Sequence, residues 1–158
     1  PFTVETDDAG RFQVWDLVPF VTEPVAVDSL SLPSPLWVPA FGLATVTVAP
    51  NGYARADIPV VEGAEVSGRV VWRDASGRTR PVSGVRVEFE HVRTGRRTRA
   101  VTFSDGEFYV LGLPPGEYRV RVPEDVAAAL GAASPTDVRL VVEPGVGPAP
   151  VVLEMGPR

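Results

Sequence analysis

Few residues of this chain could do chemistry, and the histidine is the first to consider. His91 is the only histidine among the 158 residues, and there is no cysteine. A catalytic triad or a histidine zinc site needs partners at defined geometry, and thiol chemistry needs a cysteine. His91 extends a run in which Val85, Val87 and Phe89 alternate with charged residues. We therefore interpret it as a structural residue near the end of a strand.

The acidic residues offer two further possibilities. Glu88 and Glu90 share the outer face of that strand, and paired carboxylates can hydrolyse glycosides. Arginines on neighbouring segments favour solvated cross-strand ion pairs instead. The acidic turns at Asp7-Asp8 and Asp105-Gly106 could bind calcium, but neither has the spacing of an EF-hand loop. Capping of the turn backbone is the preferred interpretation, so we expect no catalytic, cofactor-binding or metal-binding residue.

A cluster of arginines is a candidate for binding polyanions. It occupies one predicted hairpin and consists of Arg93, Arg96, Arg97 and Arg99. Such a hairpin could hold a sulfated or phosphorylated glycan of the cell envelope. The preferred interpretation is that these charges prevent edge-to-edge aggregation of the sheet.

A set of aromatic residues is the candidate for binding a partner protein or a glycan. It lies in the acidic, proline-rich first part and consists of Trp15, Phe20, Trp37 and Phe41. Phe12 and Val14 are expected to face a core, so Trp15 faces outward or into a neighbour. Exposed aromatics could stack on sugar rings or contact a partner. The preferred alternative is that they pack in the contact between the two modules, or that the strands missing from the first module would cover them.

Composition excludes several classes of function. The net charge is −5, which disfavours nonspecific binding of nucleic acid. All 15 cationic residues are arginine, and the absence of lysine rules out Schiff-base chemistry, a P-loop lysine and a lysine isopeptide crosslink. No apolar run approaches the ~20 residues that span a bilayer.

The pattern of short apolar runs predicts an all-β fold. The 15 glycines and 17 prolines are spread between valine-rich segments that alternate with period two. Residues 124–131 are alanine-rich and predict a short helix or turn. Seven strands at spacings of about ten residues fit a β-sandwich. They are predicted at 65–73, 85–90, 97–104, from 108 onward, at 117–122, 137–143 and 150–154.

The first part of the chain repeats the later half of this pattern. Gly10-Arg11-Phe12 lies 96 positions before Gly106-Glu107-Phe108, and Leu17 lies 96 before Leu113. Residues 45–48 and 54–60 correspond to 138–141 and 150–155, and Val25 corresponds loosely to Val120. We therefore predict a complete seven-stranded module at 63–158 and a partial module at 1–62 that lacks its first two strands.

Several motifs of the second part together resemble a known family. They are Val66-Ser67-Gly68-Arg69-Val70, Pro81-Val82-Ser83-Gly84-Val85, Ser104-Asp105-Gly106-Glu107-Phe108 and Leu113-Pro114-Pro115-Gly116-Glu117-Tyr118. The resemblance is to the carboxypeptidase-regulatory-like family, and collagen-adhesin B-type repeats are similar. It implies tandem antiparallel prealbumin-like (transthyretin-like or Ig-like) sandwiches, the first abbreviated, with no activity of their own.

The resemblance also sets the expected function. Such domains occur as stalks, spacers and adhesive modules of exported proteins and as accessory domains of enzymes and outer-membrane receptors. We expect a structural or docking segment of a larger cell-envelope protein that is secreted, periplasmic or on the cell surface. Its partners would be other domains of the same chain, another envelope protein or a glycan. The open first module could be completed by preceding residues, by a second copy or by a donated strand.

Overall fold

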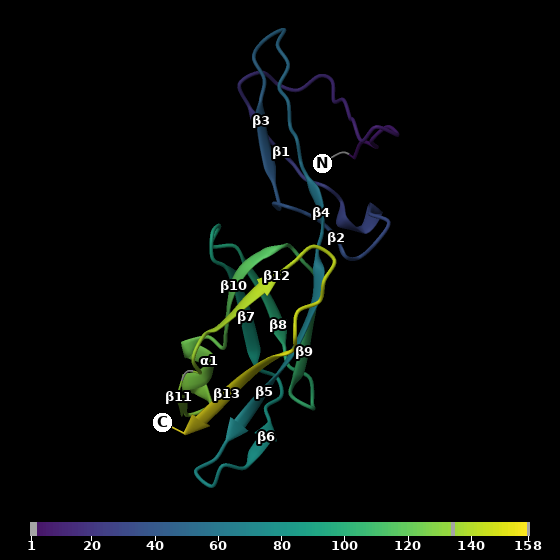
Figure 1. The fold of residues 1–158 in the computed structure, drawn as a ribbon. Coiled ribbons are helices and arrows are strands. Elements are labelled where there is room, and N and C mark those ends of the chain that lie inside the picture. Colours follow the sequence, from purple (N-terminus) through teal and green to yellow (C-terminus); the bar gives the residue numbers. More distant parts are fainter. Residues whose placement is uncertain (1–2, 134, 158) are drawn as a thin grey trace. The chain divides into compact units, whose positions relative to one another are not determined.

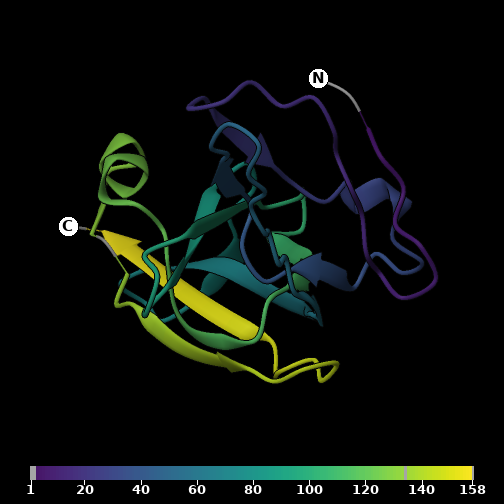
Figure 2. The same cartoon turned by 90° about the horizontal axis from the view of Figure 1, so that it is seen from above.

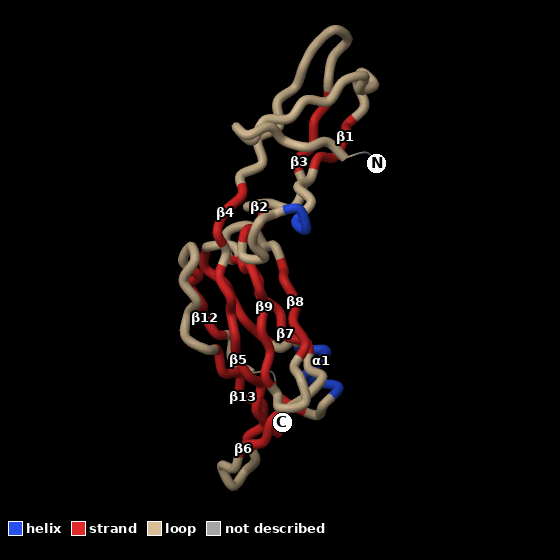
Figure 3. Tube along the Cα trace, turned by 90° about the vertical axis from the view of Figure 1, so that its right-hand side faces the viewer, coloured by secondary structure: helices blue, strands red, loops and turns tan. Residues whose placement is uncertain are grey.

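The structure is a computed structural model that describes residues 3–133 and 135–157. Its architecture is almost entirely β, as the alternating sequence predicts, and it divides into two compact units. The first unit comprises Pro1–Val27 and Phe41–Pro59, and the second comprises Asp28–Ala40 and Val60–Arg158. Figure 3 shows that most of the second unit is strand, whereas most of the first is loop.

Two large sheets form most of the second unit (Figure 1). One has the order β12-β10-β7-β8, from Val138–Val142, Gly116–Arg121, Arg86–His91 and Arg97–Val101. In the other, β5 (Ala64–Arg73) pairs with β13 (Val151–Pro157), β9 (Glu107–Leu113) and β6 (Thr79–Pro81), and β13 also pairs with β11 (Ala132–Ala133). The β5–β13 ladder is parallel, which differs from the purely antiparallel expectation, because the chain changes sheets between β12 and β13.

The remaining elements close the ends of this sandwich. Helix α1 (Glu124–Ala129) lies beside β11 (Figure 1) and fulfils the prediction of a short helix. Figure 2 shows this helix as a green coil near the arrowhead of the yellow β13. The pair β2 (Trp37–Pro39) and β4 (Val60–Glu62), with the 3-10 turn Ser29–Ser31, belongs to this unit. The repeat predicts a module boundary at residue 62, with residues 28–40 in the first module. They lie with the second unit because β2 pairs with β4.

Alternate side chains of the strands fill the space between the two sheets. Phe89 and Phe108 meet edge to face at the centre, with ring centroids 5.9 Å apart. Gly68 makes this packing possible, because a Cβ there would lie 2.5 Å from Cζ of Phe108. The buried apolar residues are Ala64, Val66, Val70, Val85, Val87, Phe89, Phe108, Leu113, Tyr118, Val120, Val122, Ala127, Ala132, Leu140, Val142, Val151, Leu153 and Met155. This is the core that the alternation predicts.

The first unit has no comparable core. Its strands β1 (Thr22–Val25) and β3 (Ala44–Thr47) form a two-stranded antiparallel sheet. None of the described residues of this unit is buried. An isolated two-stranded sheet is marginally stable in water, since it has no second layer to cover its apolar face.

The geometry of the first unit nevertheless repeats that of the second. In the turns, the N–H of Asp7 donates to the carbonyl of Arg11 as the N–H of Phe103 does to that of Glu107, both at 2.8 Å. Both turns carry a glycine with positive φ three residues after the donor, at Gly10 and Gly106. The same hydrogen bonds thus recur at the offset of 96 that the sequence shows.

The strand register also repeats. Thr22 pairs with Thr47 on β1–β3, and Tyr118 pairs with Leu140 on β10–β12. These pairs are related by the offsets of 96 and 93 found in the sequence. By this register Pro24, and not Val25, is the counterpart of Val120. The stretches 10–15 and 54–59 align with β9 and β13 but are not strands, because no ladder partner lies beside them within the described chain.

Tyr118 links the start of β10 to the corner before it. Its hydroxyl donates to the carbonyl of Pro114 at 2.8 Å, and its ring packs edge to face on His91 at 5.0 Å. Burial of the phenol raises the pKa of Tyr118 to about 12. The neutral phenol is therefore favoured by folding, and the corner depends on it remaining protonated.

We predict that replacing Tyr118 by Phe lowers the free energy of unfolding by about 1 kcal/mol, because the partly buried carbonyl of Pro114 loses its donor. The contribution of the phenol is fully present below pH ~10 and is lost as pH rises toward the folded-state pKa of about 12. Urea unfolding between pH 7 and 11.5 measures both effects. Tyr109→Phe, on a side chain that is 55% exposed, is the matched control and should change neither. If Tyr118→Phe and Tyr109→Phe have the same free energy of unfolding at every pH, the hydroxyl of Tyr118 does not stabilise the corner.

Candidate functional site

The outer face of β7 carries the ion pairs expected from the sequence. The carboxylate of Glu88 lies 3.4 Å from Nε of Arg99, 3.7 Å from Nη2 of Arg121 and 4.0 Å from Nε of Arg86. Glu90 lies 3.1 Å from Nε of Arg97 and 3.4 Å from Nη2 of Arg121. Arginines of β8 and β10 thus flank both carboxylates in a cross-strand ladder.

Glu88 is unusual because it faces outward and yet is 5% exposed. Three arginines surround its carboxylate, and one of them, Arg86, also bonds to Asp125 of α1 at 2.8 Å. A carboxylate in water-poor surroundings is stable when cations surround it. The structure therefore uses both acidic residues of β7 as partners for arginine.

The arginines of the β7–β8 hairpin separate into two groups. Arg97 and Arg99 are committed to Glu90 and Glu88. Arg93 and Arg96 are exposed and form no ion pair within the described residues. Polyanion binding by all four stays a prediction, and the two at the tip are the ones whose charge is unopposed.

His91 has the structural surroundings expected from its place at the end of the strand. Its Nδ1 accepts a hydrogen bond from the N–H of Thr94 at 3.3 Å, which helps to close the hairpin. The ring lies against Tyr118 and against the backbone of Gly116, where any Cβ would meet Nε2. No acidic or nucleophilic partner is bonded to it among the described residues.

The acidic turns cap themselves. The carboxylate of Asp7 accepts from the N–H groups of Ala9 and Arg11, and the bond from Arg11 lowers the pKa of Asp7. Asp105 accepts from the N–H of Glu107 in the same way. In residues 3–133 and 135–157, no three histidine or acidic side chains gather as a metal site requires.

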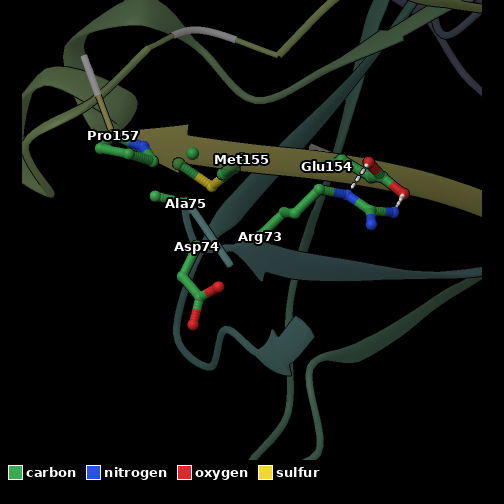
Figure 4. A pocket seen from close by; sticks show the side chains of 7 residues that line it. Arg73, Asp74, Ala75, Glu154, Met155 and Pro157 are labelled. Atoms are coloured by element: carbon green, nitrogen blue, oxygen red, sulfur yellow. Dashed lines mark hydrogen bonds and ion pairs between the residues drawn. The ribbon is translucent and has the colours of Figure 1, made fainter. Parts of the chain in front are cut away.

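A shallow hollow lies where β5 and β13 end (Figure 4). Arg73 and Glu154 line it and bond to each other twice, at 2.9 and 2.6 Å. These bonds lower the pKa of Glu154. Asp74 accepts from the hydroxyl of Ser76 at 2.6 Å, which lowers the pKa of Asp74. The polar groups of the hollow are thus paired with one another.

The structure separates the four aromatic residues singled out in the sequence. Trp15 and Phe20 are 76% and 75% exposed, and Phe41 lies in the same unit at 39%. Trp37 belongs to the second unit, on β2 opposite Glu62. Phe20 has a left-handed backbone with φ 63°, held by a hydrogen bond from its N–H to the carbonyl of Val48. Trp15 and Phe20 are therefore the most accessible of the four.

An exposed aromatic pair in the second unit was missed by the sequence analysis. The rings of Phe103 and Tyr109 lie 5.4 Å apart and are about half exposed. The alternation of β9 puts Phe108 in the core and Tyr109 outside, and this pattern in the sequence could have indicated the exposed aromatic residue. Its neighbour Leu111 is exposed on the same face.

No helix that the structure describes is long and apolar enough to cross a membrane.

Similarity to one solved structure confirms the fold, and two others match less well. The minor pilin of Streptococcus agalactiae matches with a TM-score of 0.50 at 17% identity, over 74% of this chain and 65% of that one. A streptococcal ancillary pilin matches at 0.44 and 15% identity, over 81% of this chain and 40% of that one. A candidate carbohydrate-binding protein of Pseudomonas aeruginosa matches at 0.43 and 16% identity, over 60% and 89%. No curated protein sequence matches the chain.

The sequence model of the carboxypeptidase regulatory-like domain matches residues 65–146, which is just over half of the chain. The match begins in β5 and covers the ion-pair ladder and the Tyr118 corner. It confirms the resemblance drawn from the motifs of the second part. The protein therefore belongs to the carboxypeptidase regulatory-like domain family.

Proposed function

We propose that the chain is a non-catalytic structural and docking segment of a larger exported bacterial cell-envelope protein. The observation that carries this proposal is the pairing of the ionisable groups that could have done chemistry. Glu88 and Glu90 are held by arginines, and Arg73 and Glu154 are held by each other. These are ion pairs on the outer side of the sheets, and the second unit offers a filled core with paired outer charges.

The fold supports the exported location. The second unit has the β-sandwich architecture of a minor pilin, and its family model is that of a regulatory-like domain. An accessory role beside an enzyme or an outer-membrane receptor domain fits the same fold, because the fold does not fix the function.

Cell fractionation tests the location. We expect an antibody raised against this chain to detect its parent protein in the envelope or secreted fraction of the cells that make it. Protease added to intact cells should remove a surface-exposed population, with a cytoplasmic enzyme as the protected control. Detection in the cytoplasmic fraction alone would contradict the proposal.

A structural role for the β7 ladder predicts a loss of stability from Glu88→Gln. The change leaves Arg86, Arg99 and Arg121 together without their shared anion, so the free energy of unfolding should fall by about 1–3 kcal/mol, less than for a fully buried pair. Urea unfolding measures this. Glu117→Gln is the matched control, because Glu117 pairs only with the exposed Arg139, at 3.3 Å, and should cost under ~0.5 kcal/mol. If the two variants are equally stable, the ladder is not structural.

A second candidate is the binding of a glycan or partner protein by the aromatic residues of the first unit. The exposure of Trp15 and Phe20 favours it, as does the left-handed backbone of Phe20. Such a conformation in a bulky residue costs on the order of 1 kcal/mol and is often retained where function requires it. The exposed faces could stack on sugar rings.

If this second candidate holds, purified cell-envelope polysaccharide will quench the tryptophan fluorescence of the full chain. Trp15→Ala and Phe20→Ala should each weaken that binding about fivefold, since one aromatic stacking contact contributes about 1 kcal/mol. Tyr53→Ala is the control, because Tyr53 is 97% exposed in the same unit but outside the cluster. Unchanged affinity in both cluster variants would eliminate this candidate.

A further inference from the structure

The first unit has counterparts of four strands of the sandwich but none of β5 or β7. In the second unit, β5 lies between β13 and β9, and β7 lies between β10 and β8. The repeat supplies counterparts of β9, β10, β12 and β13 at 10–15, β1, β3 and 54–60. Subtracting the offset of 96 from β5 and β7 gives positions before residue 1. The two strands that hold both sheets together are thus the ones without a counterpart.

The free edge of β1 has the hydrogen-bonding groups that a neighbouring strand needs. The N–H of Phe20 donates to Val48, so Phe20, Thr22 and Pro24 direct their backbone groups toward β3. The missing N–H of Pro24 therefore faces β3, and Glu23 and Val25 face the free edge. On β10 the corresponding edge is the one that pairs with β7.

The apolar side chains of the first unit also await a cover. Phe12 and Val14 alternate with exposed neighbours, as do Ala56 and Ile58, yet all four are only half-buried. Phe108, the counterpart of Phe12, is 1% exposed because β5 and the opposite sheet enclose it. The difference between the two phenylalanines is the absence of these strands.

We infer that the first unit is completed by a strand pair equivalent to β5 and β7, supplied by the segment of the same polypeptide that precedes Pro1. Residues 3–5 align with the end of β8, and a loop of only five residues, 92–96, joins β7 to β8. The counterpart of β7 would therefore connect directly to this chain.

The packing of the second unit defines the chemistry of that segment. Gly68 pairs with Phe108, and a Cβ at Gly68 would collide with the phenylalanine ring. The strand beside Phe12 must likewise carry a glycine opposite it, with apolar residues two positions to either side, as Val66 and Val70 flank Gly68. The repeat places this glycine about 29 residues before Pro1. A preceding sequence with no apolar-x-Gly-x-apolar strand within roughly 20–40 residues of Pro1 would overturn the inference.

Hydrogen exchange tests the inference directly. The 158-residue chain is compared with the natural polypeptide that begins about 40 residues earlier. The amides of Glu23, Val25 and residues 12–14 should exchange at least about 100-fold more slowly in the longer chain, while those of β5 should not change. Equal rates in the two chains would overturn the inference. Light scattering identifies the alternative occupant, since a dimer of the 158-residue chain that protects these same amides assigns the edge to a second copy and also overturns it.

A matched pair of variants separates completion of the core from a general effect of length. In the longer chain, Phe12→Ala should abolish most of the added protection in the first unit, because it removes the side chain that faces the supplied glycine. Gln13→Ala, on the exposed face, should leave it intact. Equal protection in both variants would show that the preceding segment does not pack on Phe12, which contradicts the inference.

Discussion

The second unit depends on β5, because this strand is paired along both edges while one of its faces forms the core. β13 runs parallel on one side, and β9 and β6 run antiparallel on the other. Such a central strand satisfies the backbone groups of its neighbours as well as its own. Gly68 lies in the middle of β5 and has no side chain, so the ring of Phe108 can lie against the backbone there. A larger residue at this position would disturb the packing of the core.

The first unit shows what the same sequence pattern does without such a strand. Its turn at Asp7–Arg11 and its β1–β3 register match those of the second unit, so both form without counterparts of β5 and β7. The stretches around Phe12 and Ile58 have the alternation of β9 and β13 but are not strands. A strand forms only when a second strand pairs with its backbone. Alternation of apolar and polar residues permits that pairing but does not supply the partner.

The outer surface of the second unit follows a different rule, which is that charges are placed to pair. Period two puts Glu88 and Glu90 on one face of β7, and the register of β8 and β10 brings arginines beside both. The same arrangement gives each of the two carboxylates arginine partners from both neighbouring strands. Exposed aromatic side chains are the remaining candidates for binding. They are Trp15 and Phe20 in one unit and Phe103 and Tyr109 in the other.

The sequence by itself determined what depends on short-range patterns: the strands of the second unit, their inward faces, the capped turns and the family. It did not reveal the parallel β5–β13 ladder, the transfer of residues 28–40 to the second unit, or the short strands β6 and β11. Those depend on which segments meet across long separations, and two- or three-residue strands are too short to show a period. It also grouped Trp37 with Trp15, which the pairing of β2 with β4 separates. Only the tertiary structure decided these points, because sheet pairing is a contact between distant residues and local alternation is compatible with several partners.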